Sequence, residues 1–148
     1  MESRQVALLI ARVVFGGFFL FNAFNHFTRT TAMAGYAASK GVPLPTVAVL
    51  VAGVLLLVGG LSLLFGWAPR VGVICLLVFL IPVTLIMHAF WADPDPQARA
   101  IDLAMFAKNL GLIGGTMAFA AVPTPWPTSV DERVRAHRAA PQRPAEQT

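Results

Sequence analysis

The chain has 148 residues, of which 57% are apolar and 12% charged, with a formal net charge of +4. One soluble core of this size does not need so much apolar surface, so the composition argues against an ordinary soluble domain and predicts a membrane protein. The positive charge lies in loops and in the C-terminal region, so nucleic acid is not an expected partner. A single cysteine, Cys75, excludes an intrachain disulfide and a cysteine metal cluster.

Four apolar runs occupy residues 6–27, 47–65, 71–88 and 103–122. Each matches the roughly 20 residues that a helix needs to cross about 30 Å of hydrocarbon. The sequence therefore predicts an all-α integral membrane four-helix bundle over residues 1–122, with the lipid bilayer as its surroundings. The first run is interpreted as a permanent helix and not a cleaved signal, because Arg12 interrupts it and no small-residue cleavage site follows Asn22.

The connections carry turn and capping residues. In the first connection, Met33, Tyr36 and Ala37 recur at helical spacing, which predicts a short helix at the membrane interface. The second connection, residues 66–70, is short enough to make its two flanking helices antiparallel neighbours. In the third, Asp95 precedes Pro96, the pattern of an N-cap followed by proline at the first helical position.

The C-terminal segment, residues 123–148, is rich in proline and charge and is predicted to be disordered. Basic residues flanking the spans predict that both termini are cytoplasmic. The cytoplasmic side would hold seven of them: Arg4, Arg12, Arg70, Arg133, Arg135, Arg138 and Arg143. The other side would hold three: Arg29, Lys40 and Arg99. Arg12 has no acidic residue in another apolar run to pair with, which leaves both an anchoring role at the interface and a functional role open.

Small residues predict where helix backbones approach closely. Gly53 with Gly60 in the second run, and a row in the fourth run, are therefore expected to pack inside the bundle. The row in the fourth run consists of Ala107, Gly111, Gly115 and Ala118. The same pattern also leaves a homo-oligomer open.

Strongly polar residues gather near one end of three of the four runs. The candidate ligand-binding residues are Asn22, Asn25, His26, His88, Trp91, Lys108 and Asn109. One interpretation is that each lies at the interface and reaches water or headgroups. The other is a shared site, because polar groups at membrane depth usually line a bundle interior or a cavity. Catalytic residues cannot be assigned, since no nucleophile and base pair or phosphate loop is present.

Imidazole, amide and ammonium groups beside aromatic residues suit hydrogen bonding to the carbonyls of an apolar ring such as a quinone. Axial ligation of a haem by His26 and His88 would require both rings to face one cavity of macrocycle size and is not favoured. No metal site is predicted, because the two histidines lack carboxylate or thiolate support.

Several sequence segments resemble the DoxX family of small membrane proteins. They are Leu9-Ile10-Ala11-Arg12, Phe19-Leu20-Phe21-Asn22, Asn25-His26-Phe27, the run from Tyr36 to Pro43, Gly59-Gly60, Met87-His88-Ala89-Phe90-Trp91 and Phe106-Ala107-Lys108-Asn109-Leu110. The resemblance extends from about residue 8 to residue 121 and leaves the C-terminal segment out. It implies a four-helix membrane protein. Many members carry an acidic residue in the second helix where this chain has Leu56, a departure that removes either a partner for Arg12 or a proton carrier.

The family takes its name from subunits linked to quinone-dependent oxidation of sulfur compounds, so the resemblance implies a redox or oxidative-stress setting. Two hypotheses follow. The first is a quinone-interacting accessory subunit that depends on a redox partner protein, because the chain carries no cofactor signature of its own. The second is a non-catalytic membrane scaffold or small-ligand-binding protein, in which the same polar residues hold water, a headgroup or a small anion.

Overall fold

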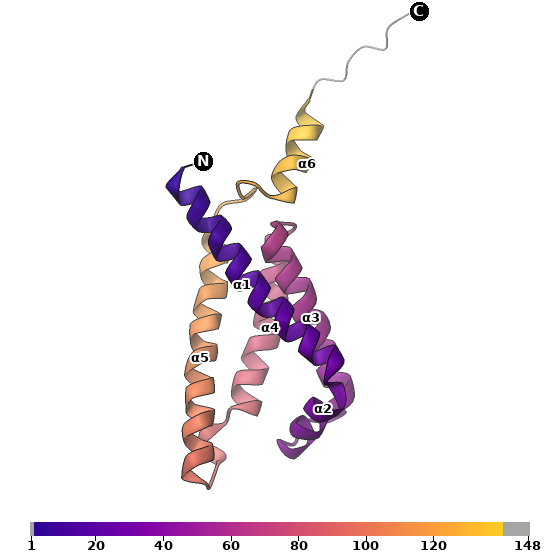
Figure 1. The fold of residues 1–148 in the computed structure, drawn as a ribbon, viewed down its shortest axis with the longest axis vertical. Coiled ribbons are helices and arrows are strands. Elements are labelled where there is room, and N and C mark those ends of the chain that lie inside the picture. Colours follow the sequence, from indigo (N-terminus) through magenta and orange to yellow (C-terminus); the bar gives the residue numbers. More distant parts are fainter. Residues whose placement is uncertain (1, 141–148) are drawn as a thin grey trace, which may run out of the picture.

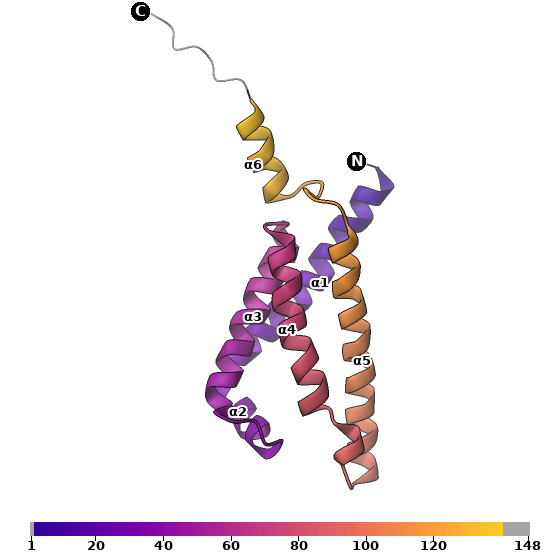
Figure 2. The same ribbon diagram turned by 180° about the vertical axis from the view of Figure 1, so that it is seen from behind.

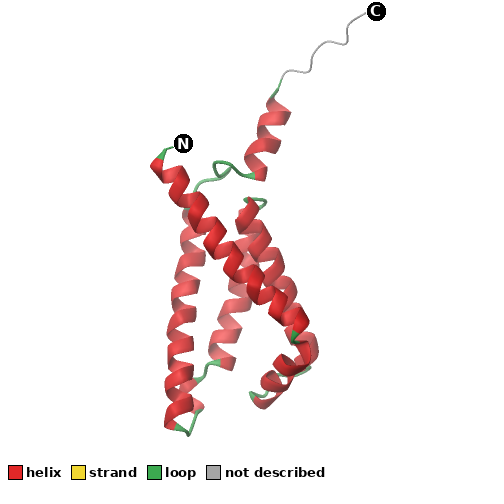
Figure 3. Ribbon diagram, viewed as in Figure 1, coloured by secondary structure: helices red, strands yellow, loops and turns green. Residues whose placement is uncertain are grey.

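The computed structural model describes residues 2–140, and this part of the chain is helical without strands (Figure 3). The elements are α1 (Ser3–Thr28), α2 (Thr30–Ser39), α3 (Pro45–Phe65), α4 (Pro69–Met87), the single 3₁₀ turn η1 (Phe90–Ala92), α5 (Pro96–Ala121) and α6 (Val130–Ala139). Helix α2 confirms the short helix predicted in the first connection. The Asp95 carboxylate accepts a hydrogen bond from the Ala98 amide at 2.8 Å, which confirms the predicted N-cap of α5.

Four stretches of the described chain are long and apolar enough to cross a membrane: Ser3–Thr28, Pro45–Phe65, Pro69–Ala92 and Pro96–Ala121. The predicted fold class, an all-α membrane bundle, is confirmed. Helix α4 lies between α3 and α5 in both views, and α1 crosses the bundle obliquely (Figures 1 and 2). The start of α1 and helix α6 lie at one end of the bundle, and α2 lies at the other.

Close contact between α1 and α3 depends on glycine. A Cβ atom built on Gly16 would lie 2.9 Å from the Gly60 carbonyl oxygen, and one on Gly60 would lie 3.0 Å from the Gly16 carbonyl oxygen. The two backbones therefore meet at a point that admits no side chain. Helix α5 touches α1 near the end where α6 begins, through Phe15 and Phe119, whose ring centroids are 5.2 Å apart.

The small residues of α5 do not pack as predicted. Ala107, Gly111 and Ala118 are exposed, and a Cβ atom built on Gly111 would meet nothing within 4 Å. Only Gly115 of this row is approached, by the ring of Phe15. The prediction that this row packs inside the bundle was wrong, because α5 turns it outward and uses larger side chains, including Phe119, against the core.

The structure differs from the predicted disordered segment after residue 122. Trp126 is fully buried in the main core cluster beside Phe119, at a centroid distance of 5.6 Å. Ser129 then caps α6 by accepting a hydrogen bond from the Glu132 amide at 3.0 Å. Composition alone missed this order because a single buried tryptophan anchors an otherwise polar segment. Residues 141–148 of the predicted disordered tail lie outside the described residues.

Arg12 lies inside the bundle and not at its surface, with 1% of its area exposed. Its guanidinium donates to the carbonyl oxygens of Leu63 at 3.1 Å, Leu64 at 2.9 Å and Pro127 at 3.0 Å. Leu63 and Leu64 belong to the last turn of α3, where carbonyls have no partner within the helix. The guanidinium carbon also lies 5.6 Å from the centre of the Trp126 ring. Arg12 therefore joins α1, the end of α3 and the segment before α6, and its side chain is buried within the protein.

Candidate functional site

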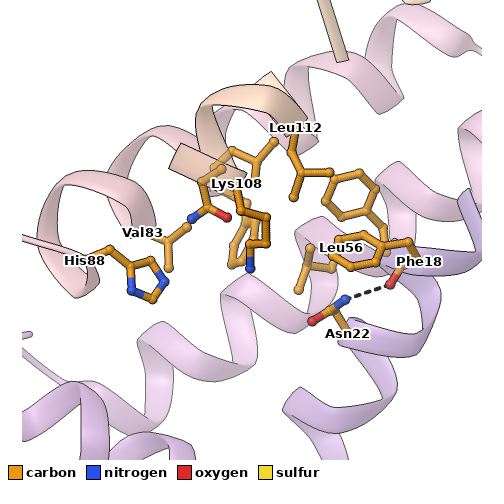
Figure 4. Close-up of a pocket in the computed structure, with 11 residues that line it drawn as sticks. Phe18, Asn22, Leu56, Val83, His88, Lys108 and Leu112 are labelled. Atoms are coloured by element: carbon orange, nitrogen blue, oxygen red, sulfur yellow. Dashed lines mark hydrogen bonds between the residues drawn. The ribbon is translucent and has the colours of Figure 1, made fainter. Parts of the chain in front are cut away.

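A cavity of about 120 Å³ lies within the helix bundle (Figure 4). Its lining comes from α1, α3, α4, α5 and the residue that ends α4. The lining residues are Phe18, Phe19, Asn22, Leu56, Phe79, Leu80, Val83, His88, Lys108, Asn109 and Leu112. Most of this wall is aromatic or aliphatic. The four polar members are all residues that the sequence predicted for the site.

Figure 4 shows the Lys108 side chain reaching into the space between His88 and Asn22. The Asn22 amide nitrogen donates to the Phe18 carbonyl oxygen at 2.8 Å, so its own oxygen remains as an acceptor. The Asn109 residue is 4% exposed; its side chain forms no hydrogen bond with residues 2–140, and its amide atoms are not fully buried, so they remain accessible from the cavity. Within the same range the Lys108 ammonium forms no ion pair. The cavity thus contains free donors from α5 facing an acceptor from α1.

The structure does not bring the other three predicted residues into the cavity. The Asn25 amide donates to the Phe21 carbonyl oxygen at 3.1 Å, within its own helix. The buried His26 ring bonds through Nδ1 to the Asn22 carbonyl oxygen at 2.8 Å and packs edge-on against Phe79. Trp91 is 58% exposed, and its ring packs edge-to-face against Phe90 and Phe106. These residues border the site without lining it.

His88 also belongs to a charged cluster that the sequence interpretation missed. Its Nδ1 lies 3.1 Å from Oδ1 of Asp102, and the other oxygen of Asp102 accepts a hydrogen bond from Lys40 Nζ at 2.8 Å. Lys40 also lies 3.3 Å from Asp93. The side chain of Asp102 is 8% exposed, whereas those of Lys40 and Asp93 are 23% and 20% exposed. The cluster therefore runs from the protein surface to the wall of the cavity.

The ion pair with Asp102 raises the pKa of Lys40 above its ordinary value of 10.5, because the ammonium form is the one that donates the hydrogen bond. A group with a raised pKa contributes stability that is present below its ordinary pKa and is lost as the pH rises through the raised one. The Lys40–Asp102 contact consequently persists throughout the neutral range. Burial, followed by the charge of Asp102, raises the pKa of the neighbouring Tyr36 phenol, which stays neutral there too.

Comparison with known proteins identifies the family of this bundle. The family model described as DoxX matches residues 7–89, which include most of α1, all of α2 to α4, and His88. The chain belongs to the DoxX family. Two relatives from Escherichia coli (strain K12) are similar over most of their length. Inner membrane protein YphA is 27% identical over 131 residues, covering 88% of this chain and 92% of YphA. Inner membrane protein YqjF is 28% identical over 133 residues, covering 88% and 93%.

No solved structure matches the chain. The DoxX match confirms the resemblance seen in the sequence and, with the four spans, establishes a multi-pass membrane protein of this family. Helix α5 lies outside the matched residues. The DoxX family model therefore covers Asn22 and His88 of the cavity. Lys108 and Asn109 come from α5, which lies beyond the matched residues.

Leu56, the position where many DoxX members are acidic, does not lie beside Arg12. Leu56 is fully buried and lines the cavity, whereas the carbonyl partners of Arg12 on α3 begin at Leu63. Seven residues of helix separate the two positions, about 10 Å along the axis. An acidic side chain at Leu56 would face the cavity with Lys108 and would not be needed by Arg12, which carbonyl groups already satisfy.

Proposed function

We propose that this DoxX protein is a quinone-interacting accessory subunit of a membrane redox complex, with electrons supplied or removed by another protein. The observation that carries the proposal is the convergence of Asn22, His88, Lys108 and Asn109 on one apolar cavity inside the bundle. A ring with carbonyl or hydroxyl groups at opposite edges suits this arrangement. One edge takes hydrogen bonds from Lys108 and Asn109, and the face of the ring packs against phenylalanine.

The size of the cavity excludes a whole lipid and limits the ligand to a small ring. An apolar protein cavity of about 150 Å³ accepts benzene, whereas this cavity measures about 120 Å³. A quinone ring would therefore enter only if side chains of the wall move aside, and its isoprenoid tail would remain outside. Lys108 lines the cavity and is also exposed on α5. The side of the cavity near Lys108 is therefore the route that we propose for a ligand arriving from the bilayer.

Replacing Lys108 tests the proposed ligand contact. Lys108→Met is expected to raise the dissociation constant of radiolabelled decylubiquinone about ten-fold or more in lipid nanodiscs, because a hydrogen bond to a charged donor is worth about 1.5–3 kcal/mol. Arg29→Met is the matched control, since Arg29 is an exposed cation between α1 and α2, and α2 lies at the end of the bundle opposite to α6. Equal affinity in the parent and the Lys108 variant would refute the ligand site.

A reduced-minus-oxidised difference spectrum of the gently purified protein separates the redox proposal from a scaffold. A quinone-type change in the ultraviolet that disappears in Lys108→Met supports the redox subunit. Saturable binding of decylubiquinone with a flat spectrum indicates that no quinone was retained from the membrane. No binding and no spectral change would identify a scaffold or a holder of a redox-silent ligand.

We further propose that the protein lies in the cytoplasmic membrane with both termini in the cytoplasm. Both relatives are named inner membrane proteins, and the basic residues near the spans number seven on the proposed cytoplasmic side against three on the other. A green fluorescent protein fused after Thr148 should fluoresce in cells, and alkaline phosphatase fused at the same point should be inactive. Active phosphatase with a dark fluorescent fusion would reverse the orientation.

A further inference from the structure

His88 contacts both the cavity and the charged cluster that contains Asp102. One edge of its imidazole meets the cavity, and the other meets the carboxylate of Asp102 at 3.1 Å. Asp102 is in turn held by Lys40 at 2.8 Å, beside the partly exposed Asp93. The cavity therefore has one titratable wall residue that is linked to the protein surface by charged groups.

The carboxylate decides which imidazole nitrogen carries the proton. Since an ionised carboxylate only accepts hydrogen bonds, Asp102 favours the neutral tautomer in which Nδ1 of His88 is protonated. The lone pair of that tautomer is on Nε2. A histidine held in this way is arranged to accept a proton from a ligand hydroxyl in the cavity.

The charges around His88 are compatible with both its neutral and its protonated form. Asp102 from α5, Lys40 after α2 and Asp93 after η1 together carry a net charge of −1, which protonation of His88 brings to zero. The other titratable groups on the adjoining elements are Arg4, Arg12 and His26 on α1, Tyr36 on α2, Arg70 and Cys75 on α4, and Arg99 and Lys108 on α5, while α3 contributes none. Lys108 is the one of these that shares the cavity with His88.

We propose that His88 is the proton-exchanging group of the cavity and that Asp102 is the residue that positions it. This inference rests on the proposed quinone site and adds that the reduced, hydroxyl-bearing form of the ligand is a partner of His88. The ligand O–H bond breaks, the proton forms an N–H bond at Nε2, and the ligand oxygen keeps the electron pair as a phenolate. The imidazolium then passes its Nδ1 proton to the Asp102 carboxylate, which releases it to water at the edge formed by Lys40 and Asp93, and His88 is left as the neutral tautomer protonated at Nε2.

Opposite pH dependences of the two ligand forms test this proposal. Decylubiquinol needs the neutral imidazole as acceptor, so its affinity should rise with pH, whereas decylubiquinone should bind more tightly when His88 is protonated. One linked proton gives up to about ten-fold in affinity per pH unit. Both affinities would be measured in nanodiscs between pH 5.5 and 8.5, a range in which Lys40 keeps its charge.

Three variants separate the roles of the residues. The slope of each affinity against pH measures its pH dependence. His88→Gln should remove both slopes, and Asp102→Asn should reduce them because the tautomer of His88 is no longer fixed by a carboxylate. Lys40→Met also breaks the ion pair with Asp102 but leaves the contact with His88, so it should keep both slopes. Gel filtration and helical circular dichroism would confirm folding, and His88→Phe provides a second replacement if the glutamine variant does not fold.

The outcomes distinguish this inference from the function on which it rests. If neither ligand form binds the parent protein, the quinone site itself is wrong and this proposal falls with it. If both forms bind and His88→Gln keeps the parental slopes, the site stands and the proton-exchange proposal is overturned. If Lys40→Met flattens the slopes as much as Asp102→Asn, Asp102 holds the cluster together and does not act through the imidazole.

Discussion

Replacing Arg12 with methionine is expected to cause one of the two largest losses of stability in this protein. The change keeps a long apolar stem but leaves three carbonyl groups, of Leu63, Leu64 and Pro127, without their donor. An unsatisfied buried acceptor costs about 1–3 kcal/mol, and water cannot replace the donor inside a bundle. The free energy of unfolding should fall by at least about 3 kcal/mol, or roughly 10 °C in Tm for a chain of this size.

Thermal unfolding in mild detergent, followed by the fraction that remains monodisperse on gel filtration, measures this loss. Arg4→Met is the matched control, since Arg4 is an exposed arginine two turns earlier on the same helix. Arg12→Lys should fall between the parent and the methionine variant, because an ammonium cannot reproduce the planar fork that reaches three carbonyls. A Tm for Arg12→Met within a degree or two of the Arg4 control would contradict the assigned role.

Gly16→Val is expected to cause the other large loss. A Cβ atom at this position would lie 2.9 Å from the Gly60 carbonyl oxygen and 3.0 Å from the Leu64 Cβ atom. These are a backbone atom and the first atom of a side chain, so neither can move aside without displacing α3. Overpacking typically costs about 1–3 kcal/mol. We expect the upper part of that range or failure to assemble.

Gly17→Val supplies an unusually close control for that experiment. A Cβ atom on Gly17, the next residue of the same helix, would meet nothing within 4 Å. The two variants share composition, hydropathy and helix propensity, so any difference in Tm or in folded yield reports the contact between α1 and α3. Equal yields of both variants would mean that α1 and α3 do not cross at Gly16 as described.

The fold was largely predictable from the sequence because hydropathy and length determine the spans in a membrane. Residues 6–27, 47–65, 71–88 and 103–122 overlap the four long helices in order. The N-cap of α5 was also predictable, because Asp95 and the amide that it binds, that of Ala98, are close together in the sequence. The segment around Trp126 was not predictable, since one tryptophan among prolines gives no sign of whether the bundle end has room to bury it.

The candidate site was only partly predictable. Helical spacing correctly grouped Asn22, Asn25 and His26 near one end of α1, but it did not determine how α1 rotates against α3. Gly53 packs against His26 and Phe27, which turns that part of the face toward α3 and leaves Asn22 at the cavity. A rotation of this kind depends on the partner helix and has no signature in the α1 sequence.

Long-range partners were the other source of error. Lys40 and Asp102 are 62 residues apart in sequence; Lys40 was interpreted as a loop charge that sets orientation, and Asp102 was not assigned to a site. The sequence interpretation considered only acidic partners for Arg12 and found none in the apolar runs, whereas its partners are backbone carbonyls, which every residue possesses. A search for opposite charges cannot find such a partner. The useful signal was weaker: Arg12 and the end of α3 lie at the same side of the membrane.

The contact between Arg12 and Pro127 constrains the order in which this protein is made. These residues are 115 positions apart, so α1 emerges from the ribosome and enters the membrane long before its last carbonyl partner exists. Once α3 is inserted, the carbonyl groups of Leu63 and Leu64 accept two of the hydrogen bonds of the guanidinium, but the third donor has no protein partner until Pro127 has been made. The last hydrogen bond that joins Arg12 to the rest of the chain therefore forms only near the end of translation.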